Sequence, residues 1–205
     1  MNLFESLHAQ PCSIEGLRES LRQRHIQTHE HCERVVLLAD AFGRACGLPH
    51  DEQIQLLYSA MFHDIGKIGV PDSILLHPDA LAPEQRETMQ LHSTMGEAIV
   101  RLMQLPKGDR IATYVRHHHE HFDSSGYPDG LEGEAIPRIA RMLSILDSYD
   151  ALRETRPYRG ALQHHEAVEI MLSESGTKHD PDLLTIFLQL ENMDEFEKKY
   201  CDRQG

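Results

Sequence analysis

The sequence predicts an all-α protein, a single helical bundle of about seven helices. Apolar residues recur every three or four positions in several segments, as they do on the buried face of a helix. No stretch shows the strict alternation of a half-buried strand, and the helical segments are separated by breaks rich in glycine and proline. The sequence contains no internal repeat and no low-complexity tract.

Two helices are predicted before residue 45. Residues 1–24 could form an amphipathic helix, with apolar positions at Ile14, Leu17 and Leu21. We treat this segment as an N-terminal helical extension and residues 25–205 as one domain. A second helix begins near Thr28, and its apolar face consists of Val35, Leu38, Ala39 and Phe42. His31 occupies the same face one turn earlier, and glycine and proline after residue 42 predict the end of the helix.

The next helix leads into a histidine and an aspartate. Its apolar positions are Ile54, Leu57, Tyr58 and Met61, and His63-Asp64 follow directly. Glycine is common just past a helix end, so Gly66 predicts that this pair lies on the last turn and faces the interior. A buried carboxylate without a partner is costly, and a metal ion is one of the few partners that relieves the cost.

Residues 66–83 contain several glycines and prolines and predict a loop with short turns at most. Pro83 suits the first turn of a helix that extends to about residue 103. The apolar stripe of this helix is Met89, His92, Gly96, Ile99 and Met103. His92 is the titratable member of the stripe. Another helix should cover about residues 109–121, and one side of it carries Ile111, Val115, His118 and Phe122.

Residues 123–130 give the densest turn signal in the chain. The following helix spans about residues 136–153, and Asp147 interrupts an otherwise apolar face. Two further helices fit residues 163–174 and 182–198. The apolar positions of the last helix include Leu183, Ile186, Phe187 and Leu190.

Composition narrows the classes of function. The formal charge of -13 argues against binding to a nucleic-acid polymer, because such binding depends on Lys and Arg that neutralise phosphates. No apolar run of about 18 residues and no basic segment followed by an apolar one is present, so we expect neither a membrane span nor a signal peptide. The four cysteines are not closely paired and indicate reduced thiols in a cytoplasmic protein. The 15 histidines approach the Lys and Arg count of 20, which suggests a function for imidazole.

Histidines and acids fall on the predicted inner faces of five helices. They are His31, His63, Asp64, His92, His118 and Asp147. Taken singly, each histidine could be a surface or hydrogen-bonded core residue, residues 117–119 could be a solvated cluster, and Asp147 could pair with Arg141 or Arg153. Taken together in one interior, they would leave many buried polar groups without partners, whereas a shared metal site would satisfy all of them. Imidazole and carboxylate without thiolate favour Fe(II) or Mn(II), with Zn as an alternative, and we interpret the cysteines near the site as packing residues.

Several stretches of the chain follow the order of a known family. They are residues 28–35, 62–71, 92–96, 118–123, 125–128, 147–152 and 156–159, together with Asp180-Pro181. Each stretch alone is weak, but the set is highly specific and spans about residues 28–187. In this order the chain resembles the HD-GYP domains, a branch of the HD metal-dependent phosphohydrolases. The resemblance implies an HD-type helical bundle that holds two or three metals and hydrolyses cyclic di-GMP, a bacterial second messenger.

Carried over by position, the resemblance implies two connected metal sites. The first site would consist of His31, His63, Asp64 and Asp147. Asp64 would bridge to a second site that consists of His92, His118 and His119. Three-metal members of the family place a glutamate one turn before the first histidine, where this chain has Gln27, so we expect two metal ions. His29 and Ser124 stand where glycine is usual in the family. Ser124 is expected to stiffen or re-aim the family's signature loop, the segment around Gly126-Tyr127-Pro128.

The implied reaction is attack on a phosphodiester by a hydroxide that bridges the two metals, and its product would be linear pGpG or GMP. Asp64 and Lys67 would be catalytic. The positions that match substrate contacts in the family are Lys67, Arg156 and Arg159, with Tyr127 in the signature loop beside the site. Without the resemblance, Lys67 could be a solvated loop lysine, and the two arginines could pair with surface glutamates such as Glu154 or Glu166.

Two other functions are compatible with the same residues. One is an HD hydrolase that acts on another nucleotide or cyclic dinucleotide. The other is a non-catalytic receptor that binds cyclic di-GMP, or a protein partner through Gly126-Tyr127-Pro128. A substrate panel would separate the two hydrolases, and binding without product in protein loaded with Fe(II) or Mn(II) would favour the receptor.

Overall fold

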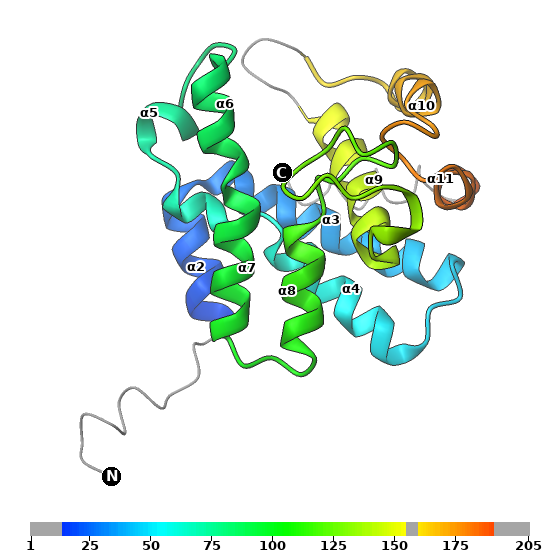
Figure 1. Ribbon diagram of the computed structural model, residues 1–205, viewed down its shortest axis with the longest axis horizontal. Coiled ribbons are helices and arrows are strands. Elements are labelled where there is room, and N and C mark those ends of the chain that lie inside the picture. Colours follow the sequence, from blue (N-terminus) through cyan, green and yellow to red (C-terminus); the bar gives the residue numbers. More distant parts are fainter. Residues whose placement is uncertain (1–13, 155–159, 191–205) are drawn as a thin grey trace, which may run out of the picture.

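The computed structural model describes residues 14–154 and 160–190 and shows an all-α fold, as the sequence predicts (Figure 1). The elements are α2 (Ile14–Arg24), α3 (Ile26–Ala45), α4 (His50–Phe62), the 3-10 helix η1 (Ile65–Gly69), α5 (Asp72–Leu75), α6 (Pro83–Gln90), α7 (His92–Leu102), α8 (Gly108–Arg116), the 3-10 helix η2 (Gly133–Ala135), α9 (Arg138–Arg153), α10 (His164–Ser173) and α11 (Pro181–Leu188). Two isolated bridges are the only β-type pairings among the described residues.

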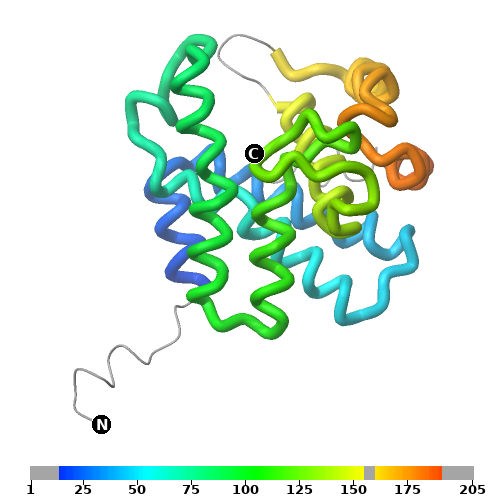
Figure 2. Tube along the Cα trace, in the orientation of Figure 1, coloured from blue at the N-terminus to red at the C-terminus, as the bar shows by residue number. Residues whose placement is uncertain are grey.

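Two apolar clusters hold the bundle together. The first joins α3, α4, α9, α10 and α11, and its fully buried side chains include Phe42, Leu56, Leu143, Leu146 and Phe187. The second joins α2, α3, α4, η1, α7 and α8, and its buried side chains include Leu21, Cys32, Phe62, Ile65 and Ile111. Figure 2 shows α7 and α8 side by side on one flank, with α9, α10 and α11 on the other. Because α3 and α4 contribute to both clusters, side chains on their inner faces lie between the two apolar clusters.

The helix boundaries differ from the predicted ones in a few places. The predicted helix over residues 83–103 is divided, because Leu91 ends α6 and directly precedes α7. The predicted loop over residues 66–83 contains η1 and the four-residue α5. These divisions give more helices than the seven or so expected. The parts of the first and last predicted helices before residue 14 and after residue 190 lie outside the described residues.

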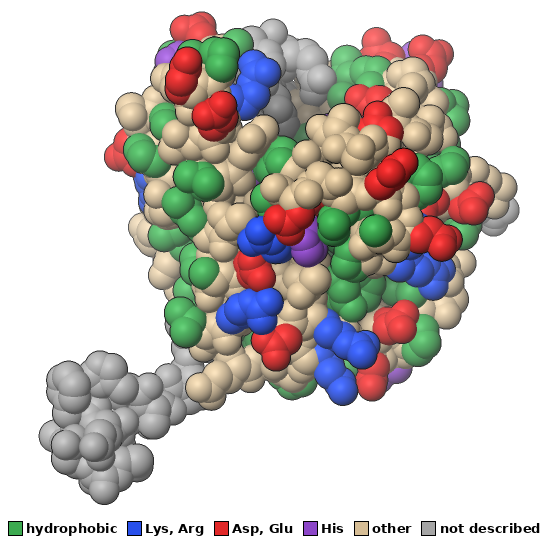
Figure 3. Space-filling view, viewed as in Figure 1, with side chains coloured by type: hydrophobic (Ala, Val, Ile, Leu, Met, Phe, Trp, Pro, Cys, Tyr) green, Lys and Arg blue, Asp and Glu red, His purple; other side chains and the backbone are tan. Residues whose placement is uncertain are grey.

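The surface carries charged side chains of both signs. On the face that Figure 3 shows, acidic and basic side chains intermingle over the described helices. Among the described helices, none has the combination of length and apolarity that a membrane crossing requires.

Candidate metal centre

The structure brings all seven sequence-predicted metal ligands to one place between the two apolar clusters. His31 comes from α3 and Asp147 from α9, whereas the other five lie at helix ends or in turns. These five are His63 and Asp64 after α4, His92 as the first residue of α7, and His118 and His119 after α8. The ligand-type atoms of two triads, His31 with His63 and Asp64 and His92 with His118 and His119, each lie within 4.8 Å of one another.

Asp64 occupies the middle of the cluster. Its Oδ2 lies 3.6 Å from Nε2 of His63 and 3.9 Å from Nε2 of His31. Its Oδ1 lies 3.4 Å from Nε2 of His92, which belongs to the other triad. One carboxylate therefore presents a different oxygen to each group of histidines, which is the arrangement that a bridging ligand needs.

Three of the histidines are oriented by their own turns. Nδ1 of His63 donates to the carbonyl of Ala60 at 2.8 Å, and Nδ1 of His92 donates to that of Met89 at 2.7 Å. Nδ1 of His118 donates to the carbonyl of Val115 at 2.6 Å. A carbonyl can only accept, so the proton of each neutral ring lies on Nδ1 and the Nε2 lone pair is free to bind a metal.

His31 is oriented by a more distant residue. Its Nδ1 lies 2.6 Å from Oδ2 of Asp150, and Asp150 in turn accepts hydrogen bonds from Nε and Nη2 of Arg34. Nε2 of His31 lies 3.0 Å from both Nε2 of His63 and Oδ1 of Asp147. Asp150 and Arg34 thus form an outer layer that fixes the ring, the role that carboxylates commonly have behind ligating histidines.

The donor set fits a cation. Nε2 of His92 and Nε2 of His118 face each other at 3.5 Å, and both carry lone pairs because the protons are on Nδ1. Nε2 of His119 lies 3.2 Å from that of His92. Electron-rich atoms converge in the same way around His31, and a positive species between them would relieve the repulsion in both triads.

Burial keeps most of the cluster in the state that metal binding requires. Burial, reinforced by His63 and His92, lowers the pKa of His118 to about 3, and burial lowers the pKa of His119 well below its usual range. Burial alone would raise the pKa of Asp64, but Lys67 and the histidines outweigh it and hold that pKa well below the ordinary value. Neutral imidazoles and ionised carboxylates are the ligand forms.

His31 is the exception. Its burial lowers the pKa, but hydrogen bonds with Asp147 and Asp150 outweigh this effect and raise the pKa of His31 to about 10. In the absence of a metal, a proton on His31 therefore supplies the positive charge between the neighbouring lone pairs and the carboxylate. A divalent ion would replace that proton.

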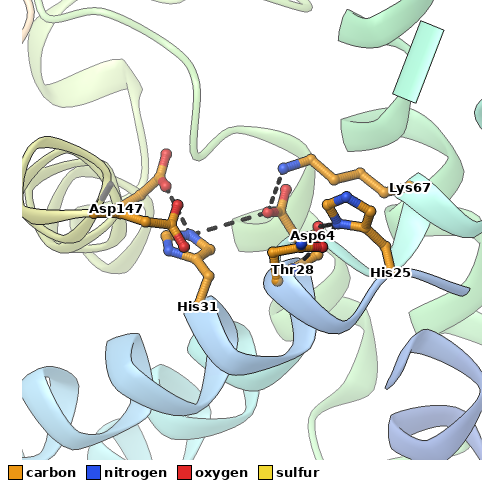
Figure 4. A pocket seen from close by; sticks show the side chains of 8 residues that line it. His25, Thr28, His31, Asp64, Lys67 and Asp147 are labelled. Atoms are coloured by element: carbon orange, nitrogen blue, oxygen red, sulfur yellow. Dashed lines mark hydrogen bonds and ion pairs between the residues drawn. The ribbon is translucent and has the colours of Figure 1, made fainter. Parts of the chain in front are cut away.

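A hollow opens onto the Asp64 side of the cluster (Figure 4). Figure 4 shows His31 and Asp147 on one side of Asp64, and Lys67 and His25 on the other. Nζ of Lys67 lies 2.6 Å from Oδ2 of Asp64, so it is paired and partly buried rather than a freely solvated loop lysine. The other residues that line the hollow are Gln27, Thr28 and Glu154.

The signature loop packs tightly against the ligand turn after α8. The backbone N–H of Tyr127 donates to the carbonyl of His119 at 3.1 Å, and the ring centroids of Tyr127 and His119 lie 4.8 Å apart. A Cβ on Gly126 would lie 2.2 Å from the backbone nitrogen of His121, so only glycine permits this approach. Ser124 adopts a left-handed φ of 68°, which glycine takes without cost and serine does not. The departure from glycine at this position therefore places backbone strain in the loop.

A third group of possible ligands holds the loop in place. It consists of His117, Glu120 and Asp129, whose ligand-type atoms also lie within 4.8 Å of one another. Both oxygens of Glu120 accept backbone N–H groups, from Asp129 at 2.7 Å and from Leu131 at 3.0 Å. The carboxylate of Asp129 accepts from Arg116 and lies 2.8 Å from Nε2 of His117. The carboxylates are thus already engaged, and we assign the group a structural role.

Some sequence interpretations change and some lie beyond the described residues. Arg141 pairs with Asp180, so the alternative in which Asp147 pairs with Arg141 is not formed. Cys32 is buried with Sγ 3.9 Å from Nδ1 of His63, in keeping with a packing role. Arg156 and Arg159 lie outside the described residues.

Sequence reasoning missed the supporting residues. Helical spacing places Asp150, or Ala151, on the same face as Asp147, but it does not indicate that Asp150 contacts His31. Arg34 and Glu154 pair across 120 residues of sequence, and Glu120 anchors the loop by side chain to backbone contacts. No local pattern signals such contacts. The sequence does not single out His25, and it marks Thr28 only as a helix start, because nothing in it indicates that they line the hollow.

Comparison with known proteins places these features in a family. Residues 17–183 match the family described as HD domain. A cyclic di-GMP phosphodiesterase of Thermotoga maritima is 38% identical over 178 residues, which cover 87% of this chain and 48% of that protein. A 3'3'-cGAMP-specific phosphodiesterase of Vibrio cholerae is 33% identical over 188 residues, which cover 89% of this chain and 35% of that protein. The chain thus spans less than half the length of either relative.

Solved structures share the fold. The structure of a cyclic GMP-AMP specific phosphodiesterase of Vibrio cholerae superposes with a TM-score of 0.68 at 20% identity and covers 90% of this chain and 49% of that one. The HD domain of the Listeria monocytogenes phosphodiesterase PgpH, in complex with cyclic di-AMP, gives a TM-score of 0.60 at 18% identity. The superposition covers 83% of this chain and 91% of that one. The match over residues 17–183 and the 38% identical relative confirm the resemblance seen in the sequence: the chain belongs to the HD domain family.

Proposed function

We propose that this protein is a metal-dependent phosphodiesterase that hydrolyses a cyclic dinucleotide, with cyclic di-GMP as the first candidate substrate. The observation that carries the proposal is Asp64, which presents one oxygen to each histidine triad at the floor of an open hollow. The hollow has a volume of about 130 Å³, and His31, Asp64, Lys67 and Asp147 are among the residues that line it. The relatives named for cyclic di-GMP and 3'3'-cGAMP support the substrate class.

The proposed cofactors are two divalent ions, iron or manganese, with zinc as an alternative. They would be held by His31, His63, Asp64, His92, His118, His119 and Asp147. Bound divalent ions supply Lewis acidity that polarises phosphate oxygens and activates water for attack. Gln27 lines the hollow beside His31 with a neutral amide, which is a weak ligand and supports two ions rather than three.

Two groups of the chain would contact the substrate directly. Lys67 lies beside Asp64, and the carboxylate raises the pKa of its ammonium against the effect of burial, so it stays charged. A donor aimed at charge that develops in the transition state is typically worth about 2.7–4 kcal/mol. Burial and the nearby Asp147 and Asp64 raise the pKa of the Tyr127 hydroxyl, so Tyr127 stays protonated and can donate.

The two arginines are proposed as further phosphate contacts. Glu154 lines the hollow and is the last described residue before the segment that contains Arg156 and Arg159. A protein partner at residues 126–128 stays a prediction from the sequence, because the observed contacts of Tyr127 are directed toward the ligand turn.

Turnover and metal content test the proposal together. Protein purified without oxygen and loaded with Fe(II) or Mn(II) should convert cyclic di-GMP to pGpG or GMP, and chromatography would identify the product. Asp64→Ala should lose both metals by elemental analysis and all turnover. Asp51→Ala, at an exposed position of the first turn of α4, is the matched control. Near-normal metal content in Asp64→Ala would contradict the bridging role.

A parallel assay with 3'3'-cGAMP addresses the second candidate substrate. Relatives named for either nucleotide match this chain at similar identity. Faster turnover of 3'3'-cGAMP would assign the site to that nucleotide. Binding of either nucleotide without product would favour a receptor, a possibility that the strained backbone at Ser124 supports.

A further inference from the structure

His25 combines two roles at the edge of the hollow. It precedes α3 in an extended conformation and acts as its N-cap, because its Nδ1 accepts a hydrogen bond from the backbone N–H of Thr28 at 3.2 Å. The hydroxyl of Thr28 lies 2.8 Å from the same nitrogen. The ring also lines the hollow together with Lys67 and Asp64 (Figure 4).

The cap fixes the tautomer of His25. A nitrogen that accepts from a backbone N–H carries no proton in the neutral ring, so the proton lies on Nε2. Burial, with the nearby Lys67, lowers the pKa of His25 and keeps the ring neutral. Within the described part of the chain, no hydrogen bond is formed by Nε2, which therefore offers an N–H donor at the hollow.

Positive charge next to His25 comes from Lys67, Arg24 and the start of α3, whereas Asp64, Asp147 and Glu154 are the carboxylates that line the same hollow. The N-terminus of the 20-residue α3 carries partial positive charge, and no acidic residue lies in its first turn. Asp is a common N-cap and would neutralise this end, whereas His caps it without adding negative charge. Arg24, which directly precedes His25, donates a hydrogen bond to the carbonyl of Val70 at 2.6 Å. Val70 follows η1, so this bond holds the segment that contains Lys67 close to the start of α3.

We propose that the Nε2–H of His25 donates a hydrogen bond to a phosphate oxygen of the bound cyclic dinucleotide. This inference rests on the proposed function and adds a substrate-binding residue outside the metal centre. The N-cap hydrogen bond orients the donor before substrate arrives, so that little freedom is lost on binding.

Three variants separate the cap from the donor. His25→Ala removes both. His25→Asn places a side-chain oxygen near the position of Nδ1 and should restore the cap alone. His25→Gln places an amide N–H near the position of Nε2 and should restore the donor alone. His50→Ala, at the exposed start of α4, is the control for loss of a histidine at a helix start.

The readouts are the melting temperature of the metal-loaded protein and KM for cyclic di-GMP and for 3'3'-cGAMP. His25→Ala should raise KM about twofold to tenfold with kcat little changed, as loss of a neutral hydrogen bond predicts. It should also lower the melting temperature by about 2–4 °C through loss of the cap. His25→Asn should restore the wild-type melting temperature but not the wild-type KM. His25→Gln should restore the wild-type KM but not the wild-type melting temperature.

The outcomes decide between a phosphate contact and its rivals. An equal rise in KM for both nucleotides supports a phosphate contact, whereas a rise for one nucleotide alone would overturn it in favour of a base contact. If KM rises in the same variants in which the melting temperature falls, His25 acts as a helix cap alone and does not contact the substrate. Wild-type protein that hydrolyses neither nucleotide would instead overturn the proposed function, and this inference with it.

Discussion

At the residue scale, the histidines of the centre differ in what holds them. His63, His92 and His118 each donate to a carbonyl three residues earlier, so their orientation is local and survives changes elsewhere. His31 depends on Asp150, which lies 119 residues away. Its orientation therefore exists only when α3 and α9 are packed together, and Asp150 is the outer-layer position whose removal should be most informative.

Asp150→Asn should weaken metal binding without removing a ligand. The amide has no charge to balance the His31 ring or Arg34, and loss of such outer partners typically costs about 10–100-fold in metal affinity. Competition with a chelator of known affinity would measure the change. Asp182→Asn, at an exposed position in the first turn of α11, is the control. Equal affinity in Asp150→Asn and the control would show that Asp150 does not support the ligand.

The titration of the histidines predicts a stability maximum of the metal-free protein near pH 6.5. Below that pH the unfolded chain takes up protons that buried His118, with a pKa of about 3, does not accept, so stability falls by up to about 1.4 kcal/mol per pH unit for each such group. His31 acts oppositely, because its pKa is raised to about 10. Its contribution is complete below about pH 6.5 and is lost as the pH rises toward 10.

Urea unfolding of metal-free protein at pH 5, 6.5 and 8 would measure this profile. Free energies of unfolding that rise steadily from pH 5 to 8 would show that the proton on His31 does not stabilise the empty site. A profile that is flat between pH 5 and 6.5 would contradict the neutral state of the buried histidines.

At the scale of elements, the centre is built largely from helix ends. The apolar periodicity predicts the helices but places His63, Asp64 and His118 on helix faces, whereas they lie in the turns that follow α4 and α8. The division at Leu91 is also invisible in the sequence, because no glycine or proline interrupts the pattern there. Periodicity shows which side of a segment is buried, but the position of a helix end depends on what packs against it.

Gly66 shows such a packing constraint. A methyl group at this position would lie 1.9 Å from the carbonyl oxygen of His92 and 2.6 Å from the backbone nitrogen of Gly96. The sequence explains Gly66 as a helix end, but the structure explains it as the point where η1 touches α7. This contact sets the distance between Asp64 and His92, and so between the two triads.

Gly66→Ala should therefore affect both stability and metal binding. Overpacking typically costs about 1–3 kcal/mol, and here the neighbours that must move are backbone atoms. The shift should also separate His92 from Asp64 and lower metal affinity. Urea unfolding and chelator competition would measure the two effects. Gly160→Ala, where an added Cβ meets nothing within 4 Å, is the control, and a Gly66→Ala protein that matches it would disprove the close contact.

At the scale of the whole molecule, the ligands span residues 31–147 and lie where the two apolar clusters meet. The sequence predicts the fold class from local spacing, and it predicts the candidate ligands from residue type, spacing and, for His119, the family resemblance. It does not reveal Asp150 behind His31 or His25 at the hollow, because these contacts join segments far apart in the chain. It does not reveal the anchoring of the loop by Glu120 either, because a side chain to backbone contact leaves no pattern in the sequence. The centre thus depends on the assembly of the bundle, and by the same linkage bound metal should stabilise the bundle.

Metal removal tests this linkage. A chelator should lower the melting temperature, because bound ions would join α3, α9 and three turns, and without them the lone pairs of His92 and His118 face each other. A ligand at about 100 times its dissociation constant adds about 2.7 kcal/mol, which corresponds to about 5–10 °C for a chain of this size. Adding Mn(II) back in steps should raise the melting temperature progressively with metal concentration. Asp64→Ala should show no such dependence, and a shift of equal size in that variant would mean that the stabilising ion binds elsewhere on the protein.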